Sequence, residues 1–137
     1  MSLVTLIRPP VLVAKWAHTT PTCPPIGLAY LAAVLIGNDI AVNVVDAVGN
    51  APDQMLPTDD ERFLSHGQST EEIIEGIDPA TQIIGISCMF SHEWPLIRSL
   101  ITRLKEVFPQ ILIVGGGEHI TALPEFSLED CGALDGG

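Results

Sequence analysis

Ile111-Leu112-Ile113-Val114-Gly115-Gly116-Gly117-Glu118-His119-Ile120-Thr121 joins an uninterrupted apolar run to three successive glycines. The four branched apolar residues predict a short strand that is buried on both faces, as in the interior of a parallel sheet. The glycines remove every Cβ at the carboxyl end of this strand, which lets another group lie against the backbone. In open α/β sheets ligands bind at that end of the strands. The same glycines could instead serve only a tight turn into a helix.

The size and charge of the chain restrict its function. The 137 residues, 47% of them hydrophobic, predict one globular domain over residues 1–137. A net charge of −11 opposes binding to nucleic acids and anionic membranes, so neither is expected as a partner. The longest apolar run, residues 28–36, is far shorter than the roughly 20 residues that span a bilayer. The amino-terminal residues lack the features of a secretion signal, which predicts a cytoplasmic location.

Strand-like and helix-like patterns alternate along the chain. Short apolar runs predict strands at 3–7, 40–45, 83–87 and 111–114, with the start of a fifth at 133–135. Helical spacing of apolar residues predicts helices at 24–36, 70–77, 94–107 and 123–130. Residues 11–25 are expected to form a long loop, and residues 49–67 a surface excursion with at most a short helix.

This alternation predicts an α/β fold with helices on both faces of a parallel sheet. We expect a flavodoxin-like, Rossmann-like doubly wound sheet of about five strands in the order 2-1-3-4-5. In that order the turns after strands one, three and four share one rim of the sheet. These turns are residues 8–25, 87–94 and 115–121, the most unusual stretches of the sequence. The rim is therefore the predicted ligand site.

Several ligand classes can be compared with this rim. A phospho-receiver needs acidic residues after strand one and an aspartate after strand three. This chain instead has Arg-Pro-Pro at 8–10 and Ser-Cys-Met at 87–89, which opposes that class. A dinucleotide site needs G-x-G-x-x-G after the first strand, whereas Gly115 and Gly117 follow the fourth. The P-loop lysine is absent. A flavin phosphate could meet the threonines at 19, 20 and 22, although the neighbouring prolines remove the amide donors such a site uses.

Ser87-Cys88-Met89 and Gly115-Gly116-Gly117 resemble two motifs of the cobalamin-binding domains. That family has D-x-H-x-x-G after strand one, S-x-L after strand three and G-G after strand four. Met89 in place of leucine conserves the side-chain volume. The similarity is closer to the domains fused to radical S-adenosylmethionine enzymes of the protoporphyrin ester cyclase type, and it covers roughly residues 3–135. The similar stretches are residues 24–33, 45–46, 84–87, 108–109 and 114–125.

The resemblance implies a role for each matching residue. Gly115, Gly116 and Gly117 would let the nucleotide tail of cobalamin descend beside the fourth strand, and Ser87 would hydrogen-bond that tail. Met89, Phe90 and Ser91 would lie under the corrin ring. His119 could donate a hydrogen bond to an amide or phosphate of the cofactor, or could serve only the start of a helix. Small residues, hydroxyls and backbone donors suit a wide and mostly apolar macrocycle.

The chain departs from the family pattern at the lower face of the cobalt. It has no D-x-H-x-x-G, and His18 lacks the required spacing. We therefore expect cobalt without a histidine ligand from below, and we predict no metal-ligating residue in the chain. Among the remaining candidates, Trp94 is expected in the core and Cys88 as a small buried hydrophobe. His66, Cys131 and residues 58–61 are expected at the surface.

The resemblance also implies a larger protein. The cysteines at 23, 88 and 131 cannot form the C-x-x-x-C-x-x-C motif that holds a [4Fe–4S] cluster. The chain is thus expected to be the amino-terminal fragment of a radical S-adenosylmethionine methyltransferase or cyclase. In that parent protein a downstream catalytic domain would hold the cluster and S-adenosylmethionine, and the fragment itself would not be catalytic. Two alternatives stay open: a cofactor-free α/β interaction module, and a flavin- or nucleotide-binding domain.

Overall fold

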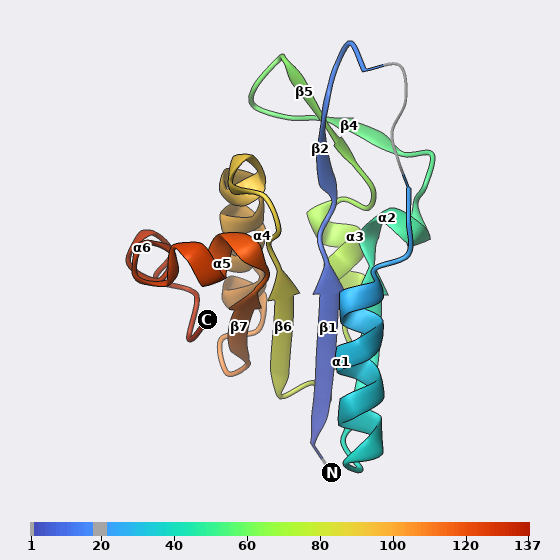
Figure 1. Ribbon diagram of the computed structural model, residues 1–137, viewed down its shortest axis with the longest axis vertical. Coiled ribbons are helices and arrows are strands. Elements are labelled where there is room, and N and C mark those ends of the chain that lie inside the picture. Colours follow the sequence, from blue (N-terminus) through green and yellow to red (C-terminus); the bar gives the residue numbers. More distant parts are fainter. Residues whose placement is uncertain (1, 18–21) are drawn as a thin grey trace.

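The computed structural model describes residues 2–17 and 22–137, so His18, Thr19 and Thr20 lie outside the described part. Its central sheet has four parallel strands in the order β3-β1-β6-β7, which confirms the predicted flavodoxin-like arrangement (Figure 1). The expected fifth strand is represented by a single parallel bridge between Val114 and Gly136, beside β7. The strands of this sheet are β1 (Leu3–Arg8), β3 (Ala41–Asp46), β6 (Ile83–Ser87) and β7 (Leu112–Gly116).

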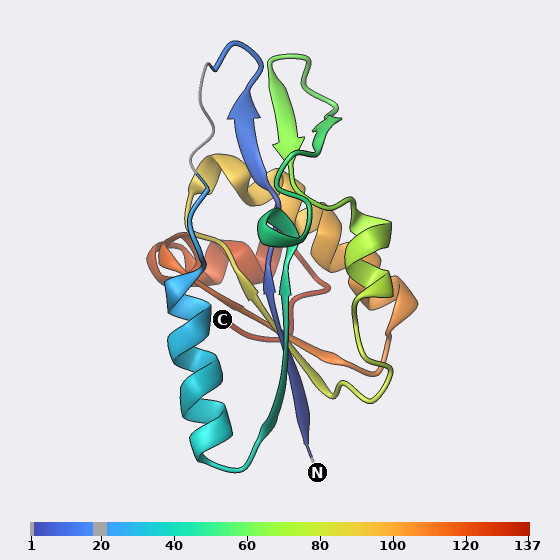
Figure 2. The ribbon, with the colours of Figure 1, turned by 90° about the vertical axis from the view of Figure 1, so that its right-hand side faces the viewer.

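Helices cover the two faces of this sheet unequally (Figures 1 and 2). Within the described residues, one face packs against a single helix, α1 (Ile26–Gly37), which forms a small apolar cluster with Val4 and Leu6 of β1. The opposite face contributes to the main core, where Ile84 and Ile113 pack against the remaining helices and their connections. The helices of this core are α2 (Ala47–Asn50), α3 (Thr70–Glu75), α4 (Trp94–Val107) and α5 (Glu118–Ala122), with a short 3-10 turn η1 (Ser91–Glu93) before α4, while α6 (Pro124–Asp130) contacts α5.

The α1 face of β7 is left partly uncovered. Ile113 points into the main core and is fully buried, so its neighbours Leu112 and Val114 point to the α1 face. Their side chains are 53% and 41% exposed, although strands of a parallel sheet are usually buried on both faces. The helix α1 contacts β1 and β3. The half of this face formed by β6 and β7 therefore remains accessible.

A second, antiparallel sheet corrects two of the sequence predictions. Its strands β2 (Val11–Ala14), β4 (Met55–Pro57) and β5 (Phe63–His66) lie in the segments expected to be a loop and a surface excursion. The sheet extends beyond the carboxyl ends of β1 and β6 (Figure 1). His66 belongs to its middle strand and is fully buried, and Cys131 is buried in the main core, so the prediction that both lie at the surface was wrong.

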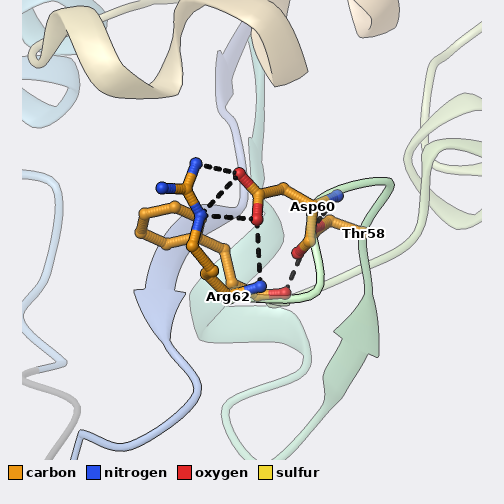
Figure 3. Close-up of polar contacts among 4 residues, drawn as sticks. Thr58, Asp60 and Arg62 are labelled. Atoms are coloured by element: carbon orange, nitrogen blue, oxygen red, sulfur yellow. Dashed lines mark hydrogen bonds and ion pairs between the residues drawn. The ribbon is translucent and has the colours of Figure 1, made fainter.

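The turn between β4 and β5 is fixed by local polar contacts (Figure 3). The guanidinium of Arg62 donates to both carboxylate oxygens of Asp60, with Nη2 2.6 Å from Oδ2. These hydrogen bonds lower the pKa of Asp60 to about 2. Thr58 closes the other side of the turn by donating to the carbonyl oxygens of Asp60 and Phe63. Residues 58–61 therefore form a hydrogen-bonded turn whose acidic side chains lie largely in solvent, as predicted.

None of the helices in the described ranges 2–17 and 22–137 combines the length and the apolar character needed to cross a membrane.

Candidate functional site

A groove lies between α1 and the carboxyl ends of β6 and β7. Its cavity volume is about 280 Å³. The residues on its sheet side belong to β1, β6 and β7, and the opposite wall is the first turn and a half of α1. The lining residues are Leu6, Gly27, Leu28, Leu31, Gly85, Ile86, Ser87, Met89, Val114, Gly115, Gly116 and Gly117. The groove therefore occupies the uncovered half of the α1 face, at the rim predicted from the sequence.

Missing side chains at two positions hollow out this groove. Gly27 is on α1, and a Cβ built there would meet no atom within 4 Å. The same is true of Gly116 at the end of β7, whose position two residues after Val114 places it on the α1 face. Gly85 of β6 pairs in register with Val114, but a Cβ there would lie 2.9 Å from Cδ2 of Leu6, so the Leu6 side chain already takes up that space. Any larger residue at Gly27 or Gly116 would occupy the groove.

The other two glycines of the triplet serve the protein's own packing. A Cβ at Gly115 would point to the main core and meet Ile120 of α5 at 3.2 Å. Gly117 has φ +98°, and a Cβ there would overlap the carbonyl of Cys88. The two residues line the groove only through their backbone atoms. Of the three glycines, Gly116 alone leaves an open position on the groove side.

The structure brings together part of the predicted site. Ser87, Met89, Gly115, Gly116 and Gly117 all line the groove. Ser87 pairs in register with Gly116, and within the described residues its hydroxyl has no hydrogen-bond partner. Met89 is half exposed at the mouth of the groove. One hydroxyl, one thioether and bare backbone thus meet in a cavity whose other walls are aliphatic.

Phe90, Ser91 and His119 do not line this groove. Phe90 is exposed and stacks on His92, with ring centroids 5.8 Å apart. Ser91 and His119 bond to each other, with 2.8 Å between the hydroxyl oxygen and Nδ1. These three residues therefore form two separate contacts in the turns next to the groove.

His119 is buried against aromatic rings. Its side chain is only 3% exposed, and its ring stacks on Trp94 with centroids 5.0 Å apart. Trp94 lies in the core, as predicted, and its indole N–H donates to Asp130. The Nε2 atom of His119 has no hydrogen-bond partner within the described residues. An orphan nitrogen of this kind is costly and is usually matched by water or a ligand.

Cys88 joins the two turns that form the rim. Its backbone N–H donates to the carbonyl of Gly116 (2.8 Å), and its carbonyl accepts from the N–H of His119 (3.2 Å). The side chain is buried, as predicted, and burial raises the pKa of its thiol to about 12. The thiol is thus neutral at physiological pH and acts as an apolar core group.

A second hollow, of about 300 Å³, lies at the carboxyl ends of β1 and β3. It is more polar than the groove, because Arg8 and Asp46 line it. Arg8 donates to the carbonyl of Cys23 (2.7 Å) and forms an ion pair of 3.4 Å with Asp46. Asp46 is the N-cap of α2 and accepts from the backbone N–H of Gly49 in that helix. The same rim therefore offers an aliphatic groove and, beside it, a polar surface.

Glu93 is a buried acid that connects the rim to the small sheet. The backbone N–H of Leu12 in β2 donates to its Oε1 over 3.3 Å. Burial raises the pKa of the Glu93 carboxyl, and the Leu12 hydrogen bond and the charges of His92 and Arg8 oppose that rise only in part. Ionised Glu93 therefore costs stability in the folded state.

Replacing Glu93 by glutamine is expected to stabilise the chain at alkaline pH. The pKa of the Glu93 carboxyl is higher in the folded chain than in the unfolded chain, so the neutral carboxyl favours folding. This contribution to stability is present at low pH and is lost as the pH rises through the folded-state pKa. Glu93→Gln keeps an acceptor for Leu12 and should raise Tm by about 2–5 °C near pH 8. The gain should vanish in acid. Thermal unfolding across pH measures this, with the exposed Glu61→Gln as control; equal gains at all pH values would contradict it.

Several groove residues were not identified as site residues from the sequence. They are Leu6, Gly27, Leu28, Leu31, Gly85, Ile86 and Val114. Gly85 could have been identified, because a glycine inside a strand often marks the close approach of another group. It also lies two residues before Ser87 and therefore on the same face of the sheet. Gly27 had no such signal, since a glycine in the first turn of a helix is unremarkable in a sequence. Its importance depends on which strands α1 packs against.

The groove fits a slender part of an organic cofactor better than a metal ion. Among the residues that the structure describes, no group of three or more His, Cys, Asp and Glu side chains could hold a metal. The open position at Gly116, the Ser87 hydroxyl, which has no partner among the described residues, and the aliphatic walls instead suit a slender apolar group with one polar atom. Fold and groove together define a flavodoxin-like cofactor-binding domain.

The chain belongs to the B12 binding domain family, whose model matches residues 16–136. It is 30% identical over 116 residues to the cytidylyl-2-hydroxyethylphosphonate methyltransferase of Streptomyces wedmorensis, covering 82% of this chain and 22% of that protein. It is 26% identical over 132 residues to an uncharacterized methyltransferase of Pyrococcus horikoshii, covering 96% of this chain and 25% of that protein. The chain thus spans about a quarter of the length of these relatives. The family supports cobalamin as the ligand.

Proposed function

We propose that the groove between α1 and β6–β7 receives the nucleotide tail of cobalamin and that the corrin ring lies over the adjacent rim. The observation that supports this most is Gly116, where the sheet side of an otherwise aliphatic groove is left open. The Ser87 hydroxyl would hydrogen-bond the tail, and Met89 would contact the ring at the mouth. When bound, cobalamin supplies methyl-transfer or radical chemistry that amino-acid side chains lack.

Three further residues of the rim are proposed to assist. Phe90 is exposed beside the groove and offers an apolar surface to the ring. Ser91 and His119 are bonded to each other, and the unpaired Nε2 of His119 could meet a polar group of the cofactor. We also propose that the chain provides no histidine below the cobalt. In support of this, D-x-H-x-x-G is absent from the sequence, and the His66 ring is buried in the small sheet.

We further propose that residues 1–137 are one module of a longer cytoplasmic protein. The supporting observation is that both relatives named above are methyltransferases about four times as long. In this proposal the module presents cobalamin to a downstream catalytic domain that holds a [4Fe–4S] cluster and S-adenosylmethionine. The module itself positions the corrinoid and excludes water from its tail, and catalysis lies in the other domain.

Titration with hydroxocobalamin tests the proposal. We expect one equivalent to shift the visible absorption of the corrin and to raise the Tm of the chain. Cobinamide, which lacks the nucleotide tail, should bind at least about tenfold more weakly, because the groove would stay empty. No spectral shift and no change in Tm would contradict cobalamin binding. Yellow colour and flavin fluorescence in the purified protein would favour the flavin alternative.

A further inference from the structure

The groove offers very little hydrogen bonding to whatever enters it. The side chains that reach it are Leu6, Leu28, Leu31, Met89 and Val114, all apolar, and Ser87, which has one hydroxyl. Among the described residues that line the groove, no side chain is charged. Most of its accessible lining is therefore carbon. Among the side chains that line the groove, only the Ser87 hydroxyl can pair with a polar atom of a guest, so a guest with several polar atoms depends on the backbone for the rest.

Corrinoids differ in the base at the end of the nucleotide tail. In 5,6-dimethylbenzimidazole, only one ring nitrogen remains besides the nitrogen joined to the ribose, and two methyl groups project from the ring. A purine such as adenine has further ring nitrogens and an amino group with two N–H donors. A polar group that loses water without gaining a partner costs free energy, whereas methyl groups gain by contact with aliphatic walls.

We propose that this groove selects corrinoids by the polarity of the tail base, favouring a methylated benzimidazole over a purine. The inference rests on the proposed binding of cobalamin in this groove. It adds that Val114, whose side chain is on the α1 face beside Gly116, determines specificity by presenting methyl groups where a purine needs hydrogen-bond partners. Leu31 of α1 does the same from the opposite wall.

Binding of three corrinoids to the chain tests this selection. We expect the corrinoid with adenine as its tail base to bind at least about tenfold more weakly than hydroxocobalamin, because at least one of its polar groups stays unpaired. Equilibrium dialysis gives the dissociation constants, and cobinamide reports binding without any base. Affinities of the two complete corrinoids within twofold, or tighter binding of the adenine form, would overturn the inference and leave cobalamin binding intact. No binding of hydroxocobalamin would overturn the proposed function as well.

A matched pair of variants assigns the selection to the groove. Val114→Thr is nearly isosteric and places a hydroxyl in the wall, so it should reduce the discrimination against the adenine form several-fold. Val44→Thr is the control, because Val44 has similar exposure, 44% against 41%, and lies on the same face of the sheet but in β3, outside the groove. It should leave the ratio of affinities unchanged. An unchanged ratio in Val114→Thr, with both variants folded by circular dichroism, would show that the groove wall does not select the base.

Discussion

The Gly116→Val chain is expected to fold like the parent and to bind hydroxocobalamin about 10- to 100-fold more weakly. Gly116 ends β7, and a Cβ at this position meets no atom of the protein within 4 Å. Its φ is not in the left-handed region, and a β-branched residue suits an extended strand. The added isopropyl group would therefore occupy groove space without straining the fold. Spectroscopic titration gives the affinity, and thermal unfolding should show a Tm within about 2 °C of the parent.

Gly136→Val is the matched control for this experiment. Gly136 bridges to Val114 from the far edge of β7, has equally open space around its Cβ position, and does not line the groove. Its substitution should leave both affinity and Tm unchanged. If Gly116→Val binds cobalamin as tightly as Gly136→Val does, the tail does not lie in this groove. Should Gly116→Val instead retain association with a protein partner while cobalamin never binds, the interaction-module alternative would be supported.

Local sequence patterns predicted the central sheet because each of its elements has a clear internal signal. The runs at 3–7, 40–45, 83–87 and 111–114 are largely apolar on both faces, and the helix at 94–107 keeps a 3.6-residue period, whereas α1 is apolar on all its faces. Right-handed crossovers then leave few ways to order the strands. The boundaries differed slightly, since β7 continues into the glycines as far as Gly116. The turn after it also contains a separate helix, α5, which the sequence raised only as an alternative role for the glycines and His119.

The small sheet could not be predicted in the same way, because its strands are short and their partners are far apart in sequence. Val11 pairs with His66, which in turn pairs with Met55. The prolines around β2 and at Pro57 indicate loops when they are considered locally. His66 becomes buried only when β2 and β4 both pair with β5, the strand that contains it. Pairing between distant segments has no signature in a local window of sequence.

The groove was predicted at the correct rim but with incomplete walls. Side chains alternate between the two faces of a sheet along each strand, which assigns a face to Ser87 and to Gly116. These two residues could therefore be placed together from the sequence once the strand order was known. The wall formed by α1 depends on how that helix packs, which no local pattern specifies. For His119, the sequence suggested a contact with the cofactor because the residue follows the glycines. In the structure its ring instead stacks on Trp94 and bonds to Ser91. Adjacency in sequence did not determine which way the side chain points.

Gly117 has a backbone geometry that only glycine tolerates. Its φ of +98° and ψ of 173° lie in a region that is almost closed to other residues. The position is also crowded, because a Cβ would overlap the carbonyl oxygen of Cys88 and lie 2.8 Å from its carbonyl carbon. The Cys88 carbonyl cannot easily withdraw, since it accepts from the N–H of His119 at the start of α5. Strain and overlap therefore act together at this residue.

Gly117→Ala is accordingly expected to destabilise the chain by about 2–5 kcal/mol, combining backbone strain with overpacking. For a domain of this size, this corresponds to a fall in Tm of about 10 °C or more. Gly116→Ala provides the control one residue away, because its Cβ has open space and its backbone is unstrained; its Tm should change by less than about 2 °C. Calorimetry of both variants measures the difference. A Gly117→Ala chain as stable as Gly116→Ala would show that the two turns are not held together through the contact between Gly117 and Cys88.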